Sequence, residues 1–167
     1  MALTVETGSG SASSESYASV ADVDTYQSNR GVTLWATLST AEKEQALRRA
    51  TTYMEQVYRL KWIGRRYLSA QALSWPRIDA ERADYPDTYD TDAIPAEVVS
   101  ACCELAFKAA FGDLAPDLGR TTKREKVDVI EVEYEKGVPY VRYRAIDNLL
   151  APLLTSIGST FARVVRA

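Results

Sequence analysis

The sequence contains no histidine and only two cysteines among its 167 residues. Without histidine, Ser-His-Asp and Cys-His catalysis are excluded, and the commonest general base and metal ligand are missing. The cysteines are neighbours, Cys102 and Cys103, and two thiols without histidine cannot complete a structural zinc site. Because both fall within an expected helix, we expect buried, small apolar side chains in a reducing compartment, with a strained vicinal disulfide as the alternative.

An excess of positive charge, a long apolar run and a phosphate-binding loop are also missing. The net charge is −3 and the isoelectric point is about 5.1, which is not the basic footprint of a duplex-binding protein. No apolar run approaches the ~20 residues of a membrane span, and residues 1–6 lack the basic and apolar regions of a signal peptide. The eight glycines are scattered along the chain, so they do not form the glycine-rich loop that binds phosphates. We therefore expect no membrane contact, no cofactor and no enzymatic activity.

Acidic residues gather in one segment, residues 79–93, which contains Asp84, Asp87, Asp90 and Asp92. A calcium-binding EF-hand loop needs oxygens at alternating positions, a glycine and a terminal glutamate, and this spacing does not match. No pair of carboxylates is singled out for glycosidase chemistry. The segment is expected to be an acidic loop without a metal site or catalytic residues.

Three amphipathic helices are expected in the first two-thirds of the chain. Ser19 with Asp22, and Ser39 with Glu42, have the spacing of helix N-terminal capping boxes. Apolar residues recur at three- and four-residue steps after each helix start. The expected helices cover approximately residues 20–30, 40–60 and 95–111, with glycines 31 and 112 as stop signals.

The remaining segments complete a mainly α fold. A strand over residues 126–134, with a bulge near Val129 and Ile130, is expected to turn at residues 136–137 and return over residues 140–143 as a β-hairpin. A short helix follows over residues 146–154. The prediction is a small helical bundle of three main helices plus a short C-terminal helix, with a hairpin and an extended C-terminal tail. One domain is expected over residues 1–154, with a flexible serine-rich loop at residues 9–16 and the tail at residues 155–167.

The connection between the second and third helices has an unusual composition. It contains two tryptophans, a glycine, a proline and an arginine that are expected to build a rigid corner anchored by aromatic side chains. They are Trp62, Gly64, Trp75, Pro76 and Arg77. Pro76 disfavours a helix at the preceding residue, while residues 70–73 could form one helical turn. Arg65, Arg66 and Arg77 have two interpretations, either stacking on bases and holding phosphates or bracing the fold through ion pairs and cation–π contacts.

Several landmarks occur in a familiar order along residues 16–154. They are the segments 16–26, 71–77 (Gln-Ala-Leu-Ser-Trp-Pro-Arg), 94–98 (Ile-Pro-Ala-Glu-Val) and 146–154. The series resembles the head–tail adaptor (connector, or head-completion) proteins of tailed bacteriophages. The resemblance implies a virion structural protein at the head–tail junction, made in the cytoplasm of the bacterial host. It forms a homo-oligomeric, commonly dodecameric ring beneath the portal protein, docks a neck or tail-completion protein, and lets DNA pass without sequence-specific binding.

Two features fit such a ring. Its subunits would meet through complementary patches, an acidic one at residues 84–92 and a basic one at Arg120, Lys123, Arg124 and Lys126, although two solvated loops remain the alternative. The C-terminal tail is expected to dock on the portal by strand addition through Phe161, Arg163, Val164, Val165 and Arg166.

A second hypothesis follows from related sequences that have carried a primosome-type, single-stranded-DNA-binding label. It predicts salt-dependent binding of an oligonucleotide, and the acidic isoelectric point argues against it.

Overall fold

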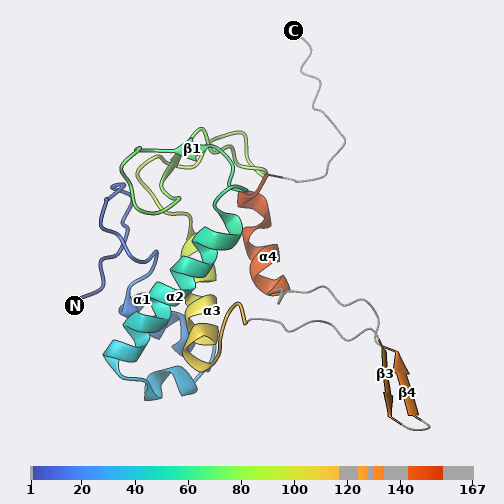
Figure 1. The fold of residues 1–167 in the computed structure, drawn as a ribbon. Helices are drawn as coiled ribbons and strands as arrows, with labels where there is room; N and C mark the ends of the chain where they lie inside the picture. Colours follow the sequence, from blue (N-terminus) through green and yellow to red (C-terminus); the bar gives the residue numbers. More distant parts are fainter. Residues whose placement is uncertain (1, 117–123, 128–129, 134–142, 156–167) are drawn as a thin grey trace, which may run out of the picture.

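The computed structural model describes residues 2–116, 124–127, 130–133 and 143–155, and they form a mainly helical fold, as predicted (Figure 1). In chain order the elements are α1 (Val20–Ser28), η1 (Leu34–Thr37), α2 (Thr40–Tyr58), β1 (Arg65–Arg66), β2 (Arg77–Ile78), α3 (Ala96–Phe111), β3 (Arg124–Val127), β4 (Ile130–Glu133), α4 (Arg144–Leu150) and η2 (Ala151–Leu153). Helices α2 and α3 pack together, and α1 and α4 each contact α3. No helix in these ranges is long and apolar enough to cross a membrane.

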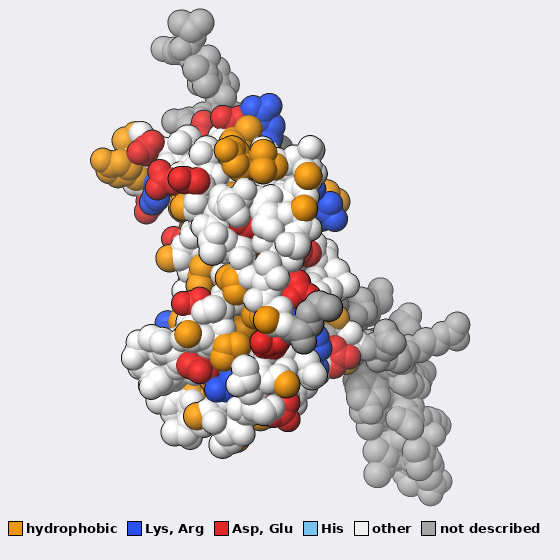
Figure 2. Space-filling model, turned by 90° about the vertical axis from the view of Figure 1, so that its left-hand side faces the viewer, with side chains coloured by type: hydrophobic (Ala, Val, Ile, Leu, Met, Phe, Trp, Pro, Cys, Tyr) orange, Lys and Arg blue, Asp and Glu red, His pale blue; other side chains and the backbone are white. Residues whose placement is uncertain are grey.

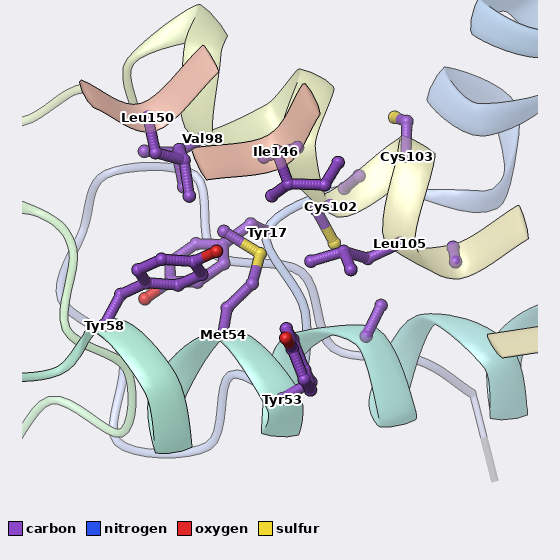
Figure 3. Close-up of a cluster of buried hydrophobic side chains, with 14 of the residues drawn as sticks. Tyr17, Tyr53, Met54, Tyr58, Val98, Cys102, Cys103, Leu105, Ile146 and Leu150 are labelled. Carbon is purple, nitrogen blue, oxygen red and sulfur yellow. The ribbon is translucent and has the colours of Figure 1, made fainter. Parts of the chain in front are cut away.

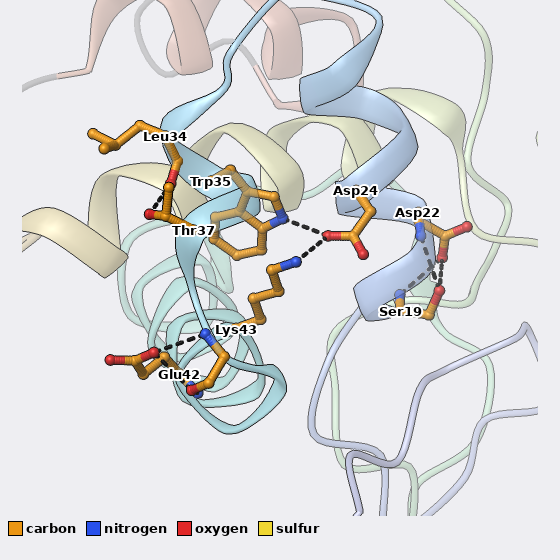
Figure 4. Close-up of polar contacts among 9 residues, drawn as sticks. Ser19, Asp22, Asp24, Leu34, Trp35, Thr37, Glu42 and Lys43 are labelled. Carbon is orange, nitrogen blue, oxygen red and sulfur yellow. Dashed lines mark hydrogen bonds and ion pairs between the residues drawn. The ribbon is translucent and has the colours of Figure 1, made fainter.

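Both predicted capping boxes are present. The Ser19 hydroxyl accepts a hydrogen bond from the Asp22 amide at 3.1 Å, and the Asp22 carboxylate accepts one from the Ser19 amide at 2.8 Å (Figure 4). Ser39 and Glu42 make the same exchange at the start of α2. These caps satisfy amides that a helix leaves without partners in its first turn, so they fix where α1 and α2 begin.

The turn between α1 and α2 is closed by one carboxylate. Asp24 accepts a hydrogen bond from the Trp35 indole nitrogen at 2.7 Å and forms an ion pair with Lys43 at 2.9 Å (Figure 4). Trp35 is almost fully buried in η1, so Asp24 satisfies its polar atom while the ring fills the core. This contact joins three elements at one end of the helical block.

The core lies where α2, α3 and α4 meet (Figure 3). The predicted apolar faces of α2 and α3 supply Leu47, Met54 and Leu105, and α4 adds Ile146 and Leu150, all buried. Alanines on both long helices, also buried, permit a close approach of the backbones; they are Ala46, Ala50, Ala101, Ala106 and Ala109. A core of this kind specifies the packing of the block but marks no binding site.

The two cysteines are free and buried, as expected from their place in α3. Figure 3 shows Cys102 pointing toward α2 and Cys103 pointing away from it. The Cys102 sulfur lies 3.6 Å from the Thr51 hydroxyl and 3.8 Å from that of Ser16. Burial raises the pKa of both thiols, so both stay protonated at neutral pH.

Protonated, buried thiols are poor nucleophiles, so we expect the native protein to resist thiol reagents. At pH 8, the native protein should react with a disulfide reagent at least ~100-fold more slowly than the same protein in denaturant. The absorbance of the released aromatic thiolate measures both rates. Rapid modification of a folded sample would show that the burial of these side chains is wrong.

The hairpin exists but lies earlier in the chain than predicted. Residues 126–134 were expected to form one bulged strand, whereas β3 and β4 are two short antiparallel strands in which Val127 pairs with Ile130. The predicted single strand is therefore wrong, since its two parts belong to two strands that pair with each other. The expected turn at residues 136–137 and residues 140–142 of the return strand lie outside the described residues, as do the docking residues of the tail. Tyr143, the last residue of the expected strand, is the N-cap of α4 instead.

The N-terminal segment is organised by one buried acid, Glu6, which is 2% exposed. One carboxylate oxygen accepts from the amides of Gly8 (2.9 Å) and Gly10 (3.0 Å). The other oxygen accepts from the Ser11 amide and the Ser14 hydroxyl, both at 2.9 Å. The serine-rich composition predicts a flexible loop. The sequence gives no sign that the Glu6 carboxylate accepts hydrogen bonds from the polar groups of this loop.

Candidate functional site

Four buried aromatic rings form a continuous stack through the connection between α2 and α3. Tyr58, Trp62, Trp75 and Tyr89 follow one another with ring centroids 5.8, 6.0 and 5.9 Å apart. All four side chains are at most 7% exposed. Edge-to-face contacts of this kind stabilise the packing of the corner, but rings this deeply buried are not available to stack on a base.

Arg77 and Gly64 hold the two strands of the corner together. The Arg77 guanidinium donates to the carbonyls of Ile63 (2.6 Å), Gly64 (2.8 Å) and Ser74 (3.1 Å), and burial lowers its pKa. β1 and β2 pair antiparallel, with Arg66 opposite Arg77, and the Trp75–Pro76 peptide bond is cis. Arg77 is thus committed to backbone carbonyls inside the fold, in line with bracing and not with phosphate binding.

The helical turn expected at residues 70–73 is absent. The Gln71 side chain, and not a helical series of backbone hydrogen bonds, pairs with the backbone groups of this segment. Gln71 is buried, and its amide nitrogen donates to the carbonyls of Leu73 (2.8 Å) and Pro76 (3.1 Å). Its amide oxygen accepts from the Leu68 amide at 2.7 Å. The segment therefore folds around Gln71 and not around a helical ladder.

The corner is docked on α2 through Glu55. This carboxylate accepts from the Tyr17 hydroxyl at 2.5 Å and from the Ser74 hydroxyl at 2.7 Å. Burial, followed by the nearby Glu55 charge, raises the pKa of Tyr17 well above its usual value, so its hydroxyl stays a donor. These bonds fix the position of the connection against the helical block.

The first part of this corner carries several exposed or partly exposed cations. We call residues 59–68 (Arg-Leu-Lys-Trp-Ile-Gly-Arg-Arg-Tyr-Leu) the basic connection, because it carries four cations and no acid. Arg59 and Arg65 are exposed, and Lys61 and Arg66 are partly exposed. Figure 2 shows orange apolar side chains beside blue cationic ones at the end of the molecule that carries β1.

Three large apolar side chains of the basic connection are exposed, which is unusual next to so many charges. Leu60 is 95% exposed, and Tyr67 and Leu68 are each 42% exposed. A mixture of cations with an exposed aromatic ring is typical of surfaces that bind single-stranded nucleic acids.

The cations are only weakly engaged by the rest of the protein. Arg65 pairs with Asp79 at 2.5 Å, but both side chains are more than 60% exposed, and such surface pairs contribute little to stability. Arg66 donates to the Gln71 carbonyl. Within the described part of the chain, no ion pair engages Arg59 or Lys61. Arg59, Lys61 and Arg65 are therefore available to an anionic ligand.

An open groove of about 910 Å³ leads away from the basic connection along α2. Arg59 and Leu60 line one part of it, and Arg48, Glu15 and Glu55 line another. Its two acids are already engaged, since Glu55 holds the corner and Glu15 pairs with Arg48 at 3.1 Å. That pairing lowers the pKa of Glu15. The groove gives an extended ligand a path over partly neutralised walls.

The structure describes the predicted acidic patch but only part of the predicted basic patch. Asp84, Asp87, Asp90 and Asp92 are exposed in an irregular loop, and the described residues contain no group of acids that could hold a metal ion. Arg120 and Lys123 lie outside the described residues. Arg124 and Lys126 lie in β3, and only their backbone is described.

One comparison with known proteins gives a result. The family model described as "Putative DnaT-like ssDNA binding protein" matches residues 1–167, the whole length of the chain. The chain belongs to this family. No curated protein and no solved structure gives a significant match.

Membership of the DnaT-like family corrects the head–tail adaptor assignment, which is wrong. The portal protein, the neck protein, the dodecameric ring and the passage of DNA without binding depended on that resemblance and are overturned with it. The physical reason is visible in its most specific motif, residues 71–77, where six of the seven residues are buried. Buried residues of this kind specify how a corner folds and carry no information about what its outer surface binds.

The residues that sequence reasoning missed are the exposed ones of the basic connection. They are Arg59, Leu60, Tyr67 and Leu68, together with the partly exposed Lys61. The signal was present, because ten consecutive residues with four cations and no acid contrast with a chain of net charge −3. The sequence pattern instead emphasised Trp62 of this segment and Trp75 of the corner, and both are core residues.

Proposed function

We propose that this protein binds single-stranded DNA through the basic connection, as a binding module and not as an enzyme. The observation that carries the proposal is the family match over the full chain. The surface at residues 59–68 supports it independently, since it combines accessible cations with an exposed ring. Proteins that bind single strands use the same combination of a positive path for phosphates and aromatic groups for bases.

The binding mode follows from the charges of this surface. Arg59, Lys61 and Arg65 contact phosphates, and Arg65 exchanges its weak partner Asp79 for a phosphate oxygen. The strand continues into the groove beside α2, where Arg59 and Leu60 stand at the junction. Affinity then comes mostly from counterion release, which falls with the logarithm of the salt concentration.

A salt titration tests the proposal. With three or four phosphate contacts, the logarithm of the association constant should fall with the logarithm of salt concentration with a slope of about −2 to −3. Removing two cations in the R59Q/R65Q variant should weaken binding roughly 10- to 60-fold at ~50 mM salt and make the slope shallower by about 1.4. Fluorescence anisotropy of a labelled oligothymidine measures both quantities.

The R49Q/R144Q variant is the matched control, because it removes the same charge from two other exposed arginines. It should keep most of the affinity. If the wild-type protein fails to bind the oligonucleotide at ~50 mM salt, the proposed function is wrong. Equal losses in the two variants would place binding elsewhere on the molecule.

A further inference from the structure

We propose that Tyr67 stacks on an unpaired base and thereby makes the site select single strands over duplex DNA. This inference rests on the proposed function and assigns a specificity-determining residue to the same surface. A duplex keeps its bases paired and stacked on one another, so an exposed ring can reach a base face only where the strand is open.

Exposure and neighbouring charge single out Tyr67 among the described aromatic residues. Three aromatic side chains are exposed, Tyr67 (42%), Tyr85 (64%) and Phe111 (48%). Tyr85 lies in the acidic loop beside Asp84 and Asp87, where phosphates are repelled, and Phe111 packs on Phe107 with centroids 5.1 Å apart. Tyr67 directly follows Arg65 and Arg66.

The backbone that carries Tyr67 is held on both sides. The Tyr67 amide donates to the Pro76 carbonyl at 3.2 Å, and the next amide, that of Leu68, donates to the buried Gln71 side chain. No hydrogen bond engages the Tyr67 hydroxyl in the part of the chain that the structure describes. A ring with a fixed backbone and a free face loses little conformational entropy when a base stacks on it.

Gly10 supports the ring and its neighbour from the protein side. A Cβ atom placed on Gly10 would lie 3.5 Å from the Tyr67 Cδ1 atom and 3.0 Å from the Leu68 Cδ1 atom. The amide of Gly10 is itself held by the buried Glu6 carboxylate. The N-terminal segment therefore lies close to one side of the ring, while the partly exposed remainder is open to a base.

An oligonucleotide without bases separates stacking from phosphate binding. Wild-type protein should bind a labelled oligothymidine roughly 5- to 150-fold more tightly than an abasic strand of equal length, the range that one stacked base provides. Y67A and Y67L should bind the two strands about equally, with an unchanged salt slope, because the phosphate contacts remain. Y67F should keep the preference, since it keeps the ring.

The Y85A variant is the matched control, because it removes another exposed tyrosine, from the acidic loop. It should behave as wild type, and a Y85A loss equal to that of Y67A would overturn the inference. If wild-type protein binds oligothymidine and Y67A retains the full preference over the abasic strand, the inference is wrong while the proposed function stands. If wild-type protein binds neither strand, both fall together.

Discussion

A Gly64→Ala substitution is expected to lower the free energy of unfolding by about 3–5 kcal/mol, combining a left-handed backbone with a steric clash. Gly64 has a φ of +65°, a conformation that costs L-residues about 1–2 kcal/mol. A Cβ atom there would lie 2.4 Å from the Ile78 carbonyl oxygen and 2.8 Å from the Ala80 nitrogen. Both neighbours are backbone atoms of the braced corner, so they cannot move aside without opening it. Urea unfolding followed by tryptophan fluorescence measures the loss.

Gly31 provides a control that separates the two causes. It has nearly the same φ, +71°, but nothing lies within 4 Å of the position its Cβ atom would take. Gly31→Ala should therefore cost only about 1 kcal/mol, the backbone contribution alone. If both substitutions cost the same, the close approach between Gly64 and Ile78 does not constrain the corner.

Replacing Glu6 by alanine is expected to destabilise the protein by about 3–5 kcal/mol, because several buried donors lose their acceptor at once. The amides of Gly8, Gly10 and Ser11 and the Ser14 hydroxyl all point at this carboxylate within 3.0 Å. Unsatisfied buried donors cost about 1–3 kcal/mol each, and opening of the loop to water recovers part of that. Urea unfolding gives the stability, and hydrogen exchange at the three amides reports the loop directly.

Two further variants make this prediction specific. Glu6→Gln keeps one acceptor oxygen but turns an amide donor toward other donors. Its loss of stability should therefore lie between zero and that of Glu6→Ala. Glu81→Ala removes an exposed glutamate and should change stability by less than about 0.5 kcal/mol. Unaltered exchange at Gly8 and Gly10 in Glu6→Ala would mean that the carboxylate does not order the segment.

The helical part of the fold could be predicted because its signals are local. Capping boxes, apolar periodicity and the Ile-Pro start of α3 all act within a few residues, and they located α1, α2 and α3 to within about two residues at most ends. The hairpin was misplaced because a change of phase in an alternating pattern marks a bulge and a tight turn equally well. Only the pairing of Val127 with Ile130 distinguishes them.

The network around Glu6 could not be predicted because it depends on backbone amides. Amides carry no sequence signal, and a serine- and glycine-rich segment has the composition of a linker whether or not an acceptor is nearby. Nothing in the sequence shows that Glu6 is buried while Glu15, a few residues later, is partly exposed.

The candidate site could not be predicted from the net charge of the whole chain. A net charge of −3 argued against DNA binding, yet the acids concentrate at residues 79–92 and the cations of the basic connection lie at residues 59–68. Binding depends on the local field and not on the sum over the chain, and within the described residues only Arg65 of the basic connection forms an ion pair, an exposed one with Asp79. The burial of Trp62 and Trp75 could not be read from composition either, so the wrong aromatics were singled out.

The end of η2 is tied to the basic connection by hydrogen bonds. Thr155 donates its amide and its hydroxyl to the Lys61 carbonyl, at 2.7 and 2.9 Å, and the adjacent Leu154 bridges to Trp62. The end of η2 and the backbone that carries Lys61 are therefore one unit, and a change in η2 would also shift a cation of the proposed binding surface.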